Sequence, residues 1–210
     1  MSERHRTRRG ENRERLMEAA LALVGEGRHF AGMGIREVTR RAGVVPTAFY
    51  RHFRSMDELG LSLVDELGLL LRQMMRDARR QAPMADRLID DSVDVFIANV
   101  LANRAFFIFM SQCLAGESRA VREAIRSEMR FFVHELASDL RQFKLLPHLD
   151  DAALEMVCEL VIRTVAFSLT DLLGLDPEDE AQISRVRDRT VSHLRLIFVG
   201  AEHWKSREAP

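Results

Sequence analysis

Residues 35–53 read IREVTRRAGVVPTAFYRHF, and this stretch decides the fold of the chain. Ile35 and Val38 begin a run of helical spacing that is expected to end at Gly43, which takes a left-handed backbone without steric cost. Pro46 suits the first position of a second helix, because its fixed φ fits there and its missing N–H is not needed. The sequence therefore predicts two short helices joined by a turn.

The second of these helices has a buried side and an outward side. Phe49 and Phe53 lie four residues apart and form one apolar face. Core packing does not explain a tyrosine, an arginine and a histidine on the rest of so short a helix. Helix-turn-helix proteins insert the first residues of such a helix into the major groove. The DNA-contact candidates are Arg36, Pro46, Thr47, Ala48, Tyr50, Arg51 and His52.

The charge is distributed unevenly along the 210 residues. The whole chain has a net charge of −1, which taken alone argues against a nucleic-acid-binding protein. Residues 1–54, however, hold 12 arginines and 6 acidic residues, whereas the remainder holds 19 basic and 26 acidic residues. A basic N-terminal head on an acidic body is typical of a phosphate-binding domain joined to a self-associating or ligand-binding domain.

The rest of the chain is predicted to be helical, because no run alternates with period two for long enough to form a strand. Residues 1–11 are arginine-rich without an apolar period, which predicts a mobile arm at a minor groove or, equally, a frayed terminus. Ser55 with Glu58 predicts a capping box, and Asp150 and Asp176 are predicted N-caps. The further helices are expected at about 12–26, 55–81, 84–102, 104–114, 118–144, 150–174 and 177–204.

The expected fold is thus all-α with nine helices. A DNA-binding head with its basic arm occupies residues 1–54, and a body for ligand binding and dimerisation occupies 55–210. The helix at 55–81 is long enough to connect the two.

These motifs resemble the DNA-binding domain of the TetR family of bacterial repressors over about residues 12–60. The matching segments are Ile35-Arg36-Glu37-Val38, Ala42-Gly43-Val44, Phe49-Tyr50-Arg51-His52-Phe53 and Ser55-Met56-Asp57-Glu58. Within the family, residues 46–54 (PTAFYRHFR), 56–61 (MDELGL) and 70–76 (LLRQMMR) are similar to the FabR and DesT group, which is associated with unsaturated fatty acid synthesis and acyl thioester sensing.

The candidate DNA contacts divide by chemistry. Thr47 and Ala48 carry methyl groups suited to thymine, and Arg51 can reach guanine or phosphate. The resemblance implies that Tyr50 and His52 contact phosphate, although partial core packing and a plain surface imidazole are the alternatives. It also implies a homodimer that binds a pseudo-palindromic operator in double-stranded DNA.

Two positions depart from the family pattern. Gly34 stands where many members have a capping serine or threonine, so backbone N–H groups are expected to serve there. Thr39 stands where most have alanine, and its hydroxyl is expected to bond to the preceding turn or to lie at the rim.

The helix around 154–173 is apolar on nearly every face and so must be covered on more than one side. One cover is the body and the other is expected to be a second subunit, since TetR-like proteins dimerise through their last two helices. An intramolecular bundle is the alternative. The predicted interface residues are Leu154, Val157, Val161, Val165, Val186, Leu194 and Phe198.

Six of the twelve phenylalanines lie between residues 96 and 132, and several methionines join them. Adaptable Met beside Phe suits an alkyl-chain tunnel, although such a stripe also fits a plain core. The subgroup resemblance implies a long-chain acyl-CoA effector, no cofactor, and control of genes of unsaturated fatty acid metabolism. The candidate ligand contacts are Met74, Phe96, Phe106, Phe107, Met110, Phe131, Phe132 and Phe167.

Other functions find less support in the sequence. No Glu-x-x-His pair, His-Glu-x-x-His helix, glycine-rich phosphate loop or nucleophile elbow is present, which argues against an enzyme and a metal site. No apolar run is long enough for a membrane span and no export signal follows the N-terminus, so a cytoplasmic location is expected. Two alternatives stay open: a TetR-type regulator of an efflux or other operon with another hydrophobic ligand, and a helical lipid-binding protein.

Overall fold

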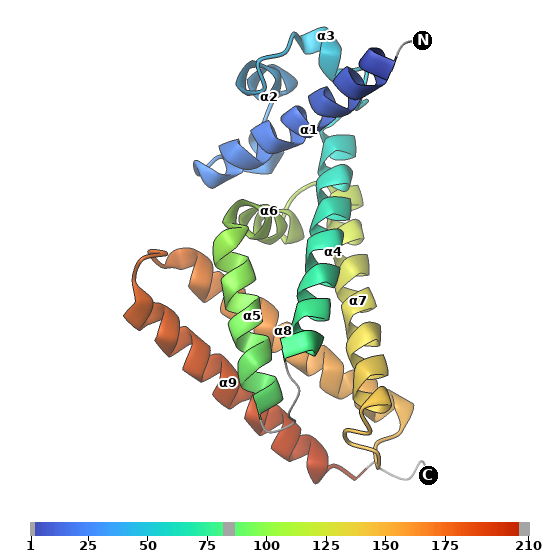
Figure 1. Cartoon of the computed structure of the whole chain (residues 1–210), viewed down its shortest axis with the longest axis vertical. Helices are drawn as coiled ribbons and strands as arrows, with labels where there is room; N and C mark the ends of the chain where they lie inside the picture. The colour runs from blue at the N-terminus through green and yellow to red at the C-terminus, as the bar shows by residue number, and fades with distance from the viewer. Residues whose placement is uncertain (1–2, 82–86, 206–210) are drawn as a thin grey trace. The chain divides into compact units, whose positions relative to one another are not determined.

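The computed structural model describes residues 3–81 and 87–205, and the expected all-α fold is confirmed for them. These residues form nine α-helices and one short 3-10 helix and no strand, and Figure 1 shows how the α-helices are arranged within each part of the chain. Their bounds are α1 (Glu3–Gly25), η1 (Phe30–Gly32), α2 (Ile35–Arg41), α3 (Pro46–Phe49), α4 (Met56–Gln81), α5 (Leu88–Ala102), α6 (Arg104–Leu114), α7 (Arg119–Gln142), α8 (Asp151–Gly174) and α9 (Glu180–Glu202).

The chain folds into two compact units that are not two consecutive segments. Unit 1 contains the chain up to Arg72 together with Asn103–Arg126, and unit 2 contains Gln73–Ala102 together with the chain from Ser127 onward. Unit 1 is therefore larger than the predicted head 1–54, because α6 contacts α1 and joins it.

Two predicted starts need correction. Residues 1–11 were expected to form an arm, but the backbone is helical from Glu3 onward. Asp176 was expected to cap the last helix, but α9 begins later, where the Asp179 carboxylate accepts a hydrogen bond from the Gln182 N–H at 2.9 Å. Asp176 instead accepts from the Glu178 N–H within a turn. The predicted start of the helix at 84 lies outside the described residues.

Other helix starts are confirmed. Asp150 caps α8 by accepting from the Ala153 N–H at 2.8 Å. Ser55 accepts from the Glu58 N–H at 3.2 Å, while the Glu58 carboxylate accepts from the Arg54 N–H at 2.6 Å. The capping box at α4 thus differs from the prediction only in the donor that Glu58 reaches.

Three helices end with the same pair of backbone hydrogen bonds, which defines a Schellman motif. At the ends of α1, α2 and α7, the left-handed residue is Gly27 (φ 88°), Gly43 (φ 65°) and Lys144 (φ 54°). Glycine adopts this backbone freely, whereas a residue with a Cβ pays for it. The α7 end therefore carries backbone strain that the other two ends avoid.

Each unit buries one of the two cysteines. Cys113 lies in α6 of unit 1, where burial and then the charge of Asp57 raise the pKa of its thiol to about 12. Cys158 lies in the α7–α8–α9 core of unit 2, where burial and then the charge of Glu155 raise the pKa of its thiol to about 11. Both thiols are therefore protonated and inert at neutral pH.

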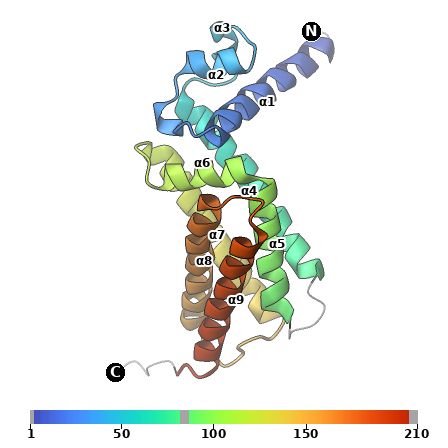
Figure 2. The same cartoon turned by 90° about the vertical axis from the view of Figure 1, so that its left-hand side faces the viewer.

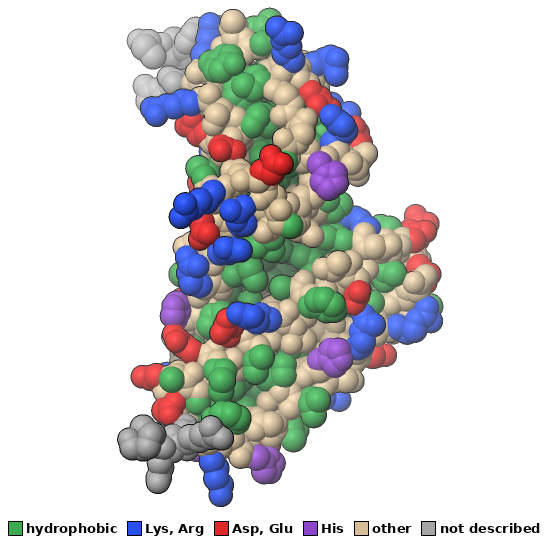
Figure 3. All heavy atoms as spheres, turned by 180° about the vertical axis from the view of Figure 1, so that it is seen from behind, with side chains coloured by type: hydrophobic (Ala, Val, Ile, Leu, Met, Phe, Trp, Pro, Cys, Tyr) green, Lys and Arg blue, Asp and Glu red, His purple; other side chains and the backbone are tan. Residues whose placement is uncertain are grey.

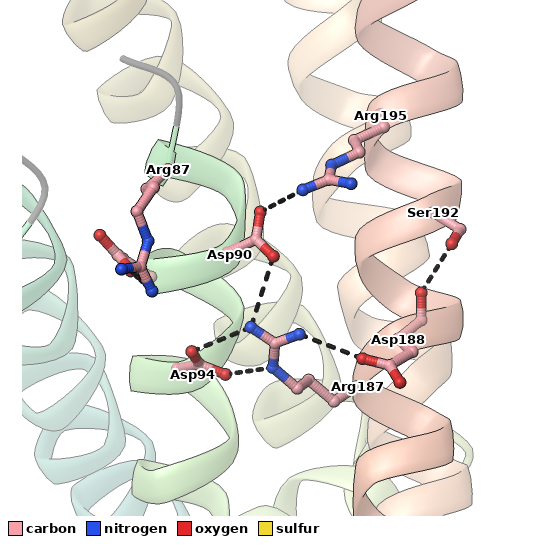
Figure 4. Close-up of polar contacts among 8 residues, drawn as sticks. Arg87, Asp90, Asp94, Arg187, Asp188, Ser192 and Arg195 are labelled. Atoms are coloured by element: carbon pink, nitrogen blue, oxygen red, sulfur yellow. Dashed lines mark hydrogen bonds and ion pairs between the residues drawn. The ribbon is translucent and has the colours of Figure 1, made fainter. Parts of the chain in front are cut away.

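Within unit 2, α5, α8 and α9 pack together, as Figures 1 and 2 show. A charged cluster joins α5 to α9. Figure 4 shows Arg187 of α9 between two carboxylates of α5, with Nε donating to Asp94 at 2.6 Å and Nη2 lying 3.4 Å from Asp90. Asp90 also accepts a hydrogen bond from Arg195 at 2.6 Å. Arg195 lies about two helical turns after Arg187 on α9.

Asp90 is the least exposed carboxylate of this cluster, with a side chain 18% exposed. Burial alone would raise its pKa, but the hydrogen bond and charge of Arg195, together with those of Arg187, outweigh burial and hold the pKa below its ordinary value. The hydrogen bond to Asp94 raises the pKa of Arg187 in turn. A carboxylate with a depressed pKa stabilises the fold above its unfolded-state pKa and loses this effect as pH falls through the folded-state pKa.

Asp90→Asn is therefore expected to lower the free energy of unfolding by about 1 kcal/mol at pH 7, a value reduced by partial exposure. The difference from wild type should stay constant above about pH 5 and shrink below about pH 4, as the wild-type carboxyl becomes protonated. Urea unfolding over a pH series measures it. Asp188→Asn is the matched control, since Asp188 also bonds to Arg187 but is well exposed. An equal loss in both variants would contradict the role of Asp90.

Candidate functional site

The first helix of the predicted motif is fixed at both ends by backbone groups. Gly34 caps α2 without a side-chain bond, and its carbonyl accepts from the N–H groups of Glu37 and Val38 at 2.9 and 3.2 Å. The Thr39 hydroxyl is buried and donates back to the Ile35 carbonyl at 2.9 Å. The Thr39 hydroxyl thus bonds to the preceding turn, which is one of the two outcomes expected for it.

The turn between the two helices is held from α1. The Arg15 guanidinium donates to the Ala42 carbonyl at 2.5 Å, which satisfies a terminal acceptor of α2. A Cβ added at Gly43 would lie 3.1 Å from the same guanidinium. Gly43 is therefore favoured by its positive φ, and a larger residue there would also have to displace the Arg15 guanidinium slightly.

The second helix packs through its two phenylalanines, as predicted. Phe49 and Phe53 are fully buried with ring centroids 5.5 Å apart, and the Arg13 guanidinium lies 5.6 Å from the Phe53 centroid. Pro46 occupies the first turn of α3 as expected. Regular α-helix ends at Phe49, and residues 50–53 continue as turns that bond back to Ala48 and Phe49.

Six of the seven predicted DNA contacts are accessible in the structure. Arg36, Pro46, Thr47, Tyr50 and Arg51 are exposed and His52 is half-buried. Ala48 is the exception: at 8% exposed, its methyl group packs inside unit 1. With so little exposed surface at Ala48, the structure gives the expected thymine contact through this residue no support.

Val45 was not predicted as a functional residue, yet it is 65% exposed. It is the N-cap of α3 and has an extended backbone (φ −72°, ψ 147°), whereas the preceding Val44 is half-buried. Successive side chains of an extended segment point to opposite sides. With Val44 packed inward, this alternation could have identified Val45 as the outward residue.

The candidate ligand residues are divided between the two units. Phe106, Phe107 and Met110 belong to α6 in unit 1, and the other five belong to unit 2. In unit 2, Phe96 and Phe132 are buried, Met74 is half-buried and Phe131 is 38% exposed. Phe167 points out of the core at 74% exposed, so it does not line an interior tunnel.

Five of the seven predicted interface residues need correction, while Val165 and Phe198 stay predictions. Leu154, Val157, Val161, Val186 and Leu194 are buried within a single protomer, and Val165 and Phe198 are half-buried. Leu154 and Val157 belong to the core that α8 shares with α7 and α9. A side chain already covered by its own chain has no surface left for a partner.

A different set of apolar side chains is exposed on α8 and α9, which lie side by side in Figure 2. Figure 3 shows hydrophobic side chains on unit 2 between charged and histidine side chains. The exposed large ones on these two helices are Met156, Leu160, Phe167, Leu196 and Val199. We call these five residues the outer face.

An open groove of about 520 Å³ runs between α8 and α9. An ion pair between Arg189 and Asp171 crosses it, and Leu160 and Phe167 of the outer face line it. The full lining is Leu160, Arg163, Thr164, Phe167, Ser168, Asp171, Arg189, Thr190 and His193.

Acidic and histidine side chains of α7 and α8 form surface ion pairs. Glu155 pairs with His134 at 2.8 Å, and Glu159 pairs with Arg163 one helical turn away. Over the described ranges, no group of three or more His, Cys, Asp or Glu side chains is arranged to hold a metal ion. Within the same ranges, no single helix is long and apolar enough to cross a membrane.

Two sequence families match this chain. Residues 16–63 match the family described as bacterial regulatory proteins, tetR family, and residues 85–197 match the tetracyclin repressor-like C-terminal domain. The second match alone spans more than half of the 210 residues.

Solved structures of similar fold agree. A TetR-family transcriptional regulator from Streptomyces coelicolor has 18% identity and a TM-score of 0.68, covering 92% of this chain and 97% of its own. A putative TetR-family regulator from Syntrophomonas wolfei has 12% identity and a TM-score of 0.71, covering 91% of this chain and 96% of its own. The fatty acid degradation regulator FadR from Bacillus halodurans has 15% identity and a TM-score of 0.65, covering 88% of this chain and 96% of its own. With both family matches and the helix-turn-helix geometry in agreement, this chain belongs to the TetR family of DNA-binding transcriptional regulators.

Proposed function

We propose that this regulator is a repressor that senses a long-chain acyl thioester, acyl-CoA, and controls genes of unsaturated fatty acid metabolism. The observation that carries the proposal is the similarity of residues 46–54, 56–61 and 70–76 to the FabR and DesT group. These segments include α3, which we call the recognition helix, and part of α4. The similarity therefore covers the helix proposed to read DNA and the helix that leads from it to the body.

The side chains of unit 2 are compatible with an alkyl ligand. Met74, Phe96, Phe131 and Phe132 come from α4, α5 and α7, and such apolar, adaptable residues suit a hydrocarbon chain. The FadR structure has a name from fatty acid metabolism, but at 15% identity its likeness concerns the fold alone. The proposal does not depend on it.

The effector is tested with a labelled duplex selected from a random pool by the wild-type protein. Palmitoyl-CoA and oleoyl-CoA, below their micellar concentrations, are expected to change the dissociation constant at least about fivefold, in either direction, whereas free coenzyme A leaves it unchanged. Fluorescence anisotropy measures the change. Mass spectrometry of molecules released from the purified protein gives an independent result. A hydrophobic cation that alone shifts DNA binding would instead favour an efflux regulator.

We also propose that the protein is a homodimer that covers the outer face of α8 and α9 with the same face of a second copy. Support comes from five large apolar side chains exposed on two adjacent helices, a patch that a soluble monomer rarely leaves open. A two-fold interface brings identical residues together. Phe167, the most exposed of the five, is the expected centre.

Phe167→Glu should raise the dimer dissociation constant at least about tenfold, because a two-fold axis places two carboxylates near one another in a desolvated contact. Sedimentation equilibrium measures it. Phe143→Glu is the matched control, since Phe143 is also exposed but lies at the end of α7, off the outer face. A Phe167 variant that remains as dimeric as the control would remove the interface.

For DNA reading, we propose that Val45 and Thr47 contact base edges and that Tyr50, Arg51 and His52 contact the backbone, with Arg51 also able to reach guanine. Support for Val45 is its exposed isopropyl group directly before the recognition helix, where an apolar side chain fits the thymine methyl group. A dimer presents two such helices to a pseudo-palindromic operator.

Substitution of a residue that contacts a base should affect DNA affinity differently from substitution of a residue that contacts phosphate. Val45→Ala should weaken binding to the selected duplex about fivefold and leave binding to a scrambled duplex unchanged, whereas Tyr50→Phe should weaken both to a similar degree. Replacing thymine by uracil in the selected duplex should lower wild-type affinity but not that of the Val45 variant. Anisotropy titrations at fixed salt measure all three, since affinity depends steeply on salt. If uracil affects both proteins equally, Val45 does not read the methyl group.

A further inference from the structure

The loop from α1 to α2 is held by a buried phenylalanine. Phe30 packs edge-on against Phe109 of α6, with ring centroids 4.9 Å apart and an interplanar angle of 84°. A Cβ added at Gly60 of α4 would lie 3.0 Å from the Phe30 ring and 2.9 Å from Val121 of α7. The ring of Phe30 therefore packs against α6 and close to Gly60 of α4, within unit 1.

One side chain of α6 bonds to the backbone of this loop twice. Gln112 Oε1 accepts from the Phe30 N–H at 3.0 Å, and Gln112 Nε2 donates to the Arg28 carbonyl at 3.3 Å. The side-chain amide thus pairs with the loop as a peptide group of a neighbouring strand would. No aliphatic side chain can replace both bonds.

The same loop is bonded to the helix-turn-helix. The Arg28 guanidinium binds the Glu37 carboxylate of α2 through two N–H groups at 2.8 and 3.1 Å, a bidentate pair of fixed geometry. The hydrogen bond from Arg28 lowers the pKa of Glu37, so the pair stays charged at neutral pH. Glu37 is adjacent to Arg36, a candidate DNA contact. A displacement of residues 28–30 would therefore act on α2, the helix that carries Arg36.

The segment that carries Gln112, Asn103–Arg126, lies along the chain between two segments of unit 2. The chain passes from α5 in unit 2 into α6 at Asn103, and leaves unit 1 again within α7 after Arg126. α6 is thus the helix that follows the first segment of unit 2 along the chain and bonds to the loop before α2.

We propose that Gln112 is a positioning residue for DNA recognition: through its amide, α6 sets the position of residues 28–30 and, through the Arg28–Glu37 pair, the position of α2. The residue contacts no DNA itself. It acts by restricting the loop, and the inference rests on DNA binding and not on the identity of the effector.

The test compares Gln112→Met, which keeps the length of the side chain and removes both bonds, with Gln112→Glu, which keeps the acceptor for Phe30 alone. The probes are the duplex selected by wild-type protein and its scrambled version. Gln112→Met should weaken binding to the selected duplex about fivefold with little effect on the scrambled duplex, and Gln112→Glu should give an intermediate loss. Gln142→Met, at an exposed glutamine of α7, is the matched control.

Hydrogen exchange at the Phe30 amide follows the bond directly and should be faster in Gln112→Met than in wild type. A purely structural role would lower the unfolding midpoint and leave the ratio of the two affinities unchanged, and that result overturns the proposal. Unchanged exchange at Phe30 overturns it as well. If Gln112→Met does not fold, the ratio measured for Gln112→Glu decides: a wild-type ratio contradicts positioning, and a reduced one supports it.

Discussion

The helix-turn-helix depends on a left-handed backbone at Gly43. The positive φ lets the N–H groups of Gly43 and Val44 bond back to the last turn of α2, which turns the chain so that Pro46 begins the next helix. Arg15 then occupies the space where a Cβ would project. Any other residue would meet the backbone strain of the positive φ and would have to displace the Arg15 guanidinium by a few tenths of an ångström. The turn at Gly43 therefore determines the position of every exposed residue of the recognition helix.

Much of the helix-turn-helix could be predicted because its signals are local. Positive φ at glycine, proline in a first turn and the i, i+4 spacing of Phe49 and Phe53 each follow from short-range sterics or periodicity. Ala48 could not be placed in the same way. A small residue on a short helix fits either the groove side or the core side, and only the position of α1 and α2 decides between them.

The outer face shows a second limit of periodicity. α8 is apolar on most of its surface, so the sequence indicates that two sides are covered without indicating which side belongs to the same chain. The β-branched and leucine residues chosen from the pattern are those that pack within the protomer, such as Val157 and Val186. The exposed set includes Phe167, which the sequence placed in a ligand site. Likewise, the contact of α6 with α1 joins segments about 80 residues apart, and no local signal reports it.

The two compact units each contain one protonated, buried cysteine, Cys113 in unit 1 and Cys158 in unit 2. Alkylating reagents attack only the thiolate, so neither residue reacts while its helix stays packed. The rate at which each sulfur is alkylated therefore measures how often the unit around it opens locally. Without any engineered probe, the native chain can report separately how often each of its two units opens.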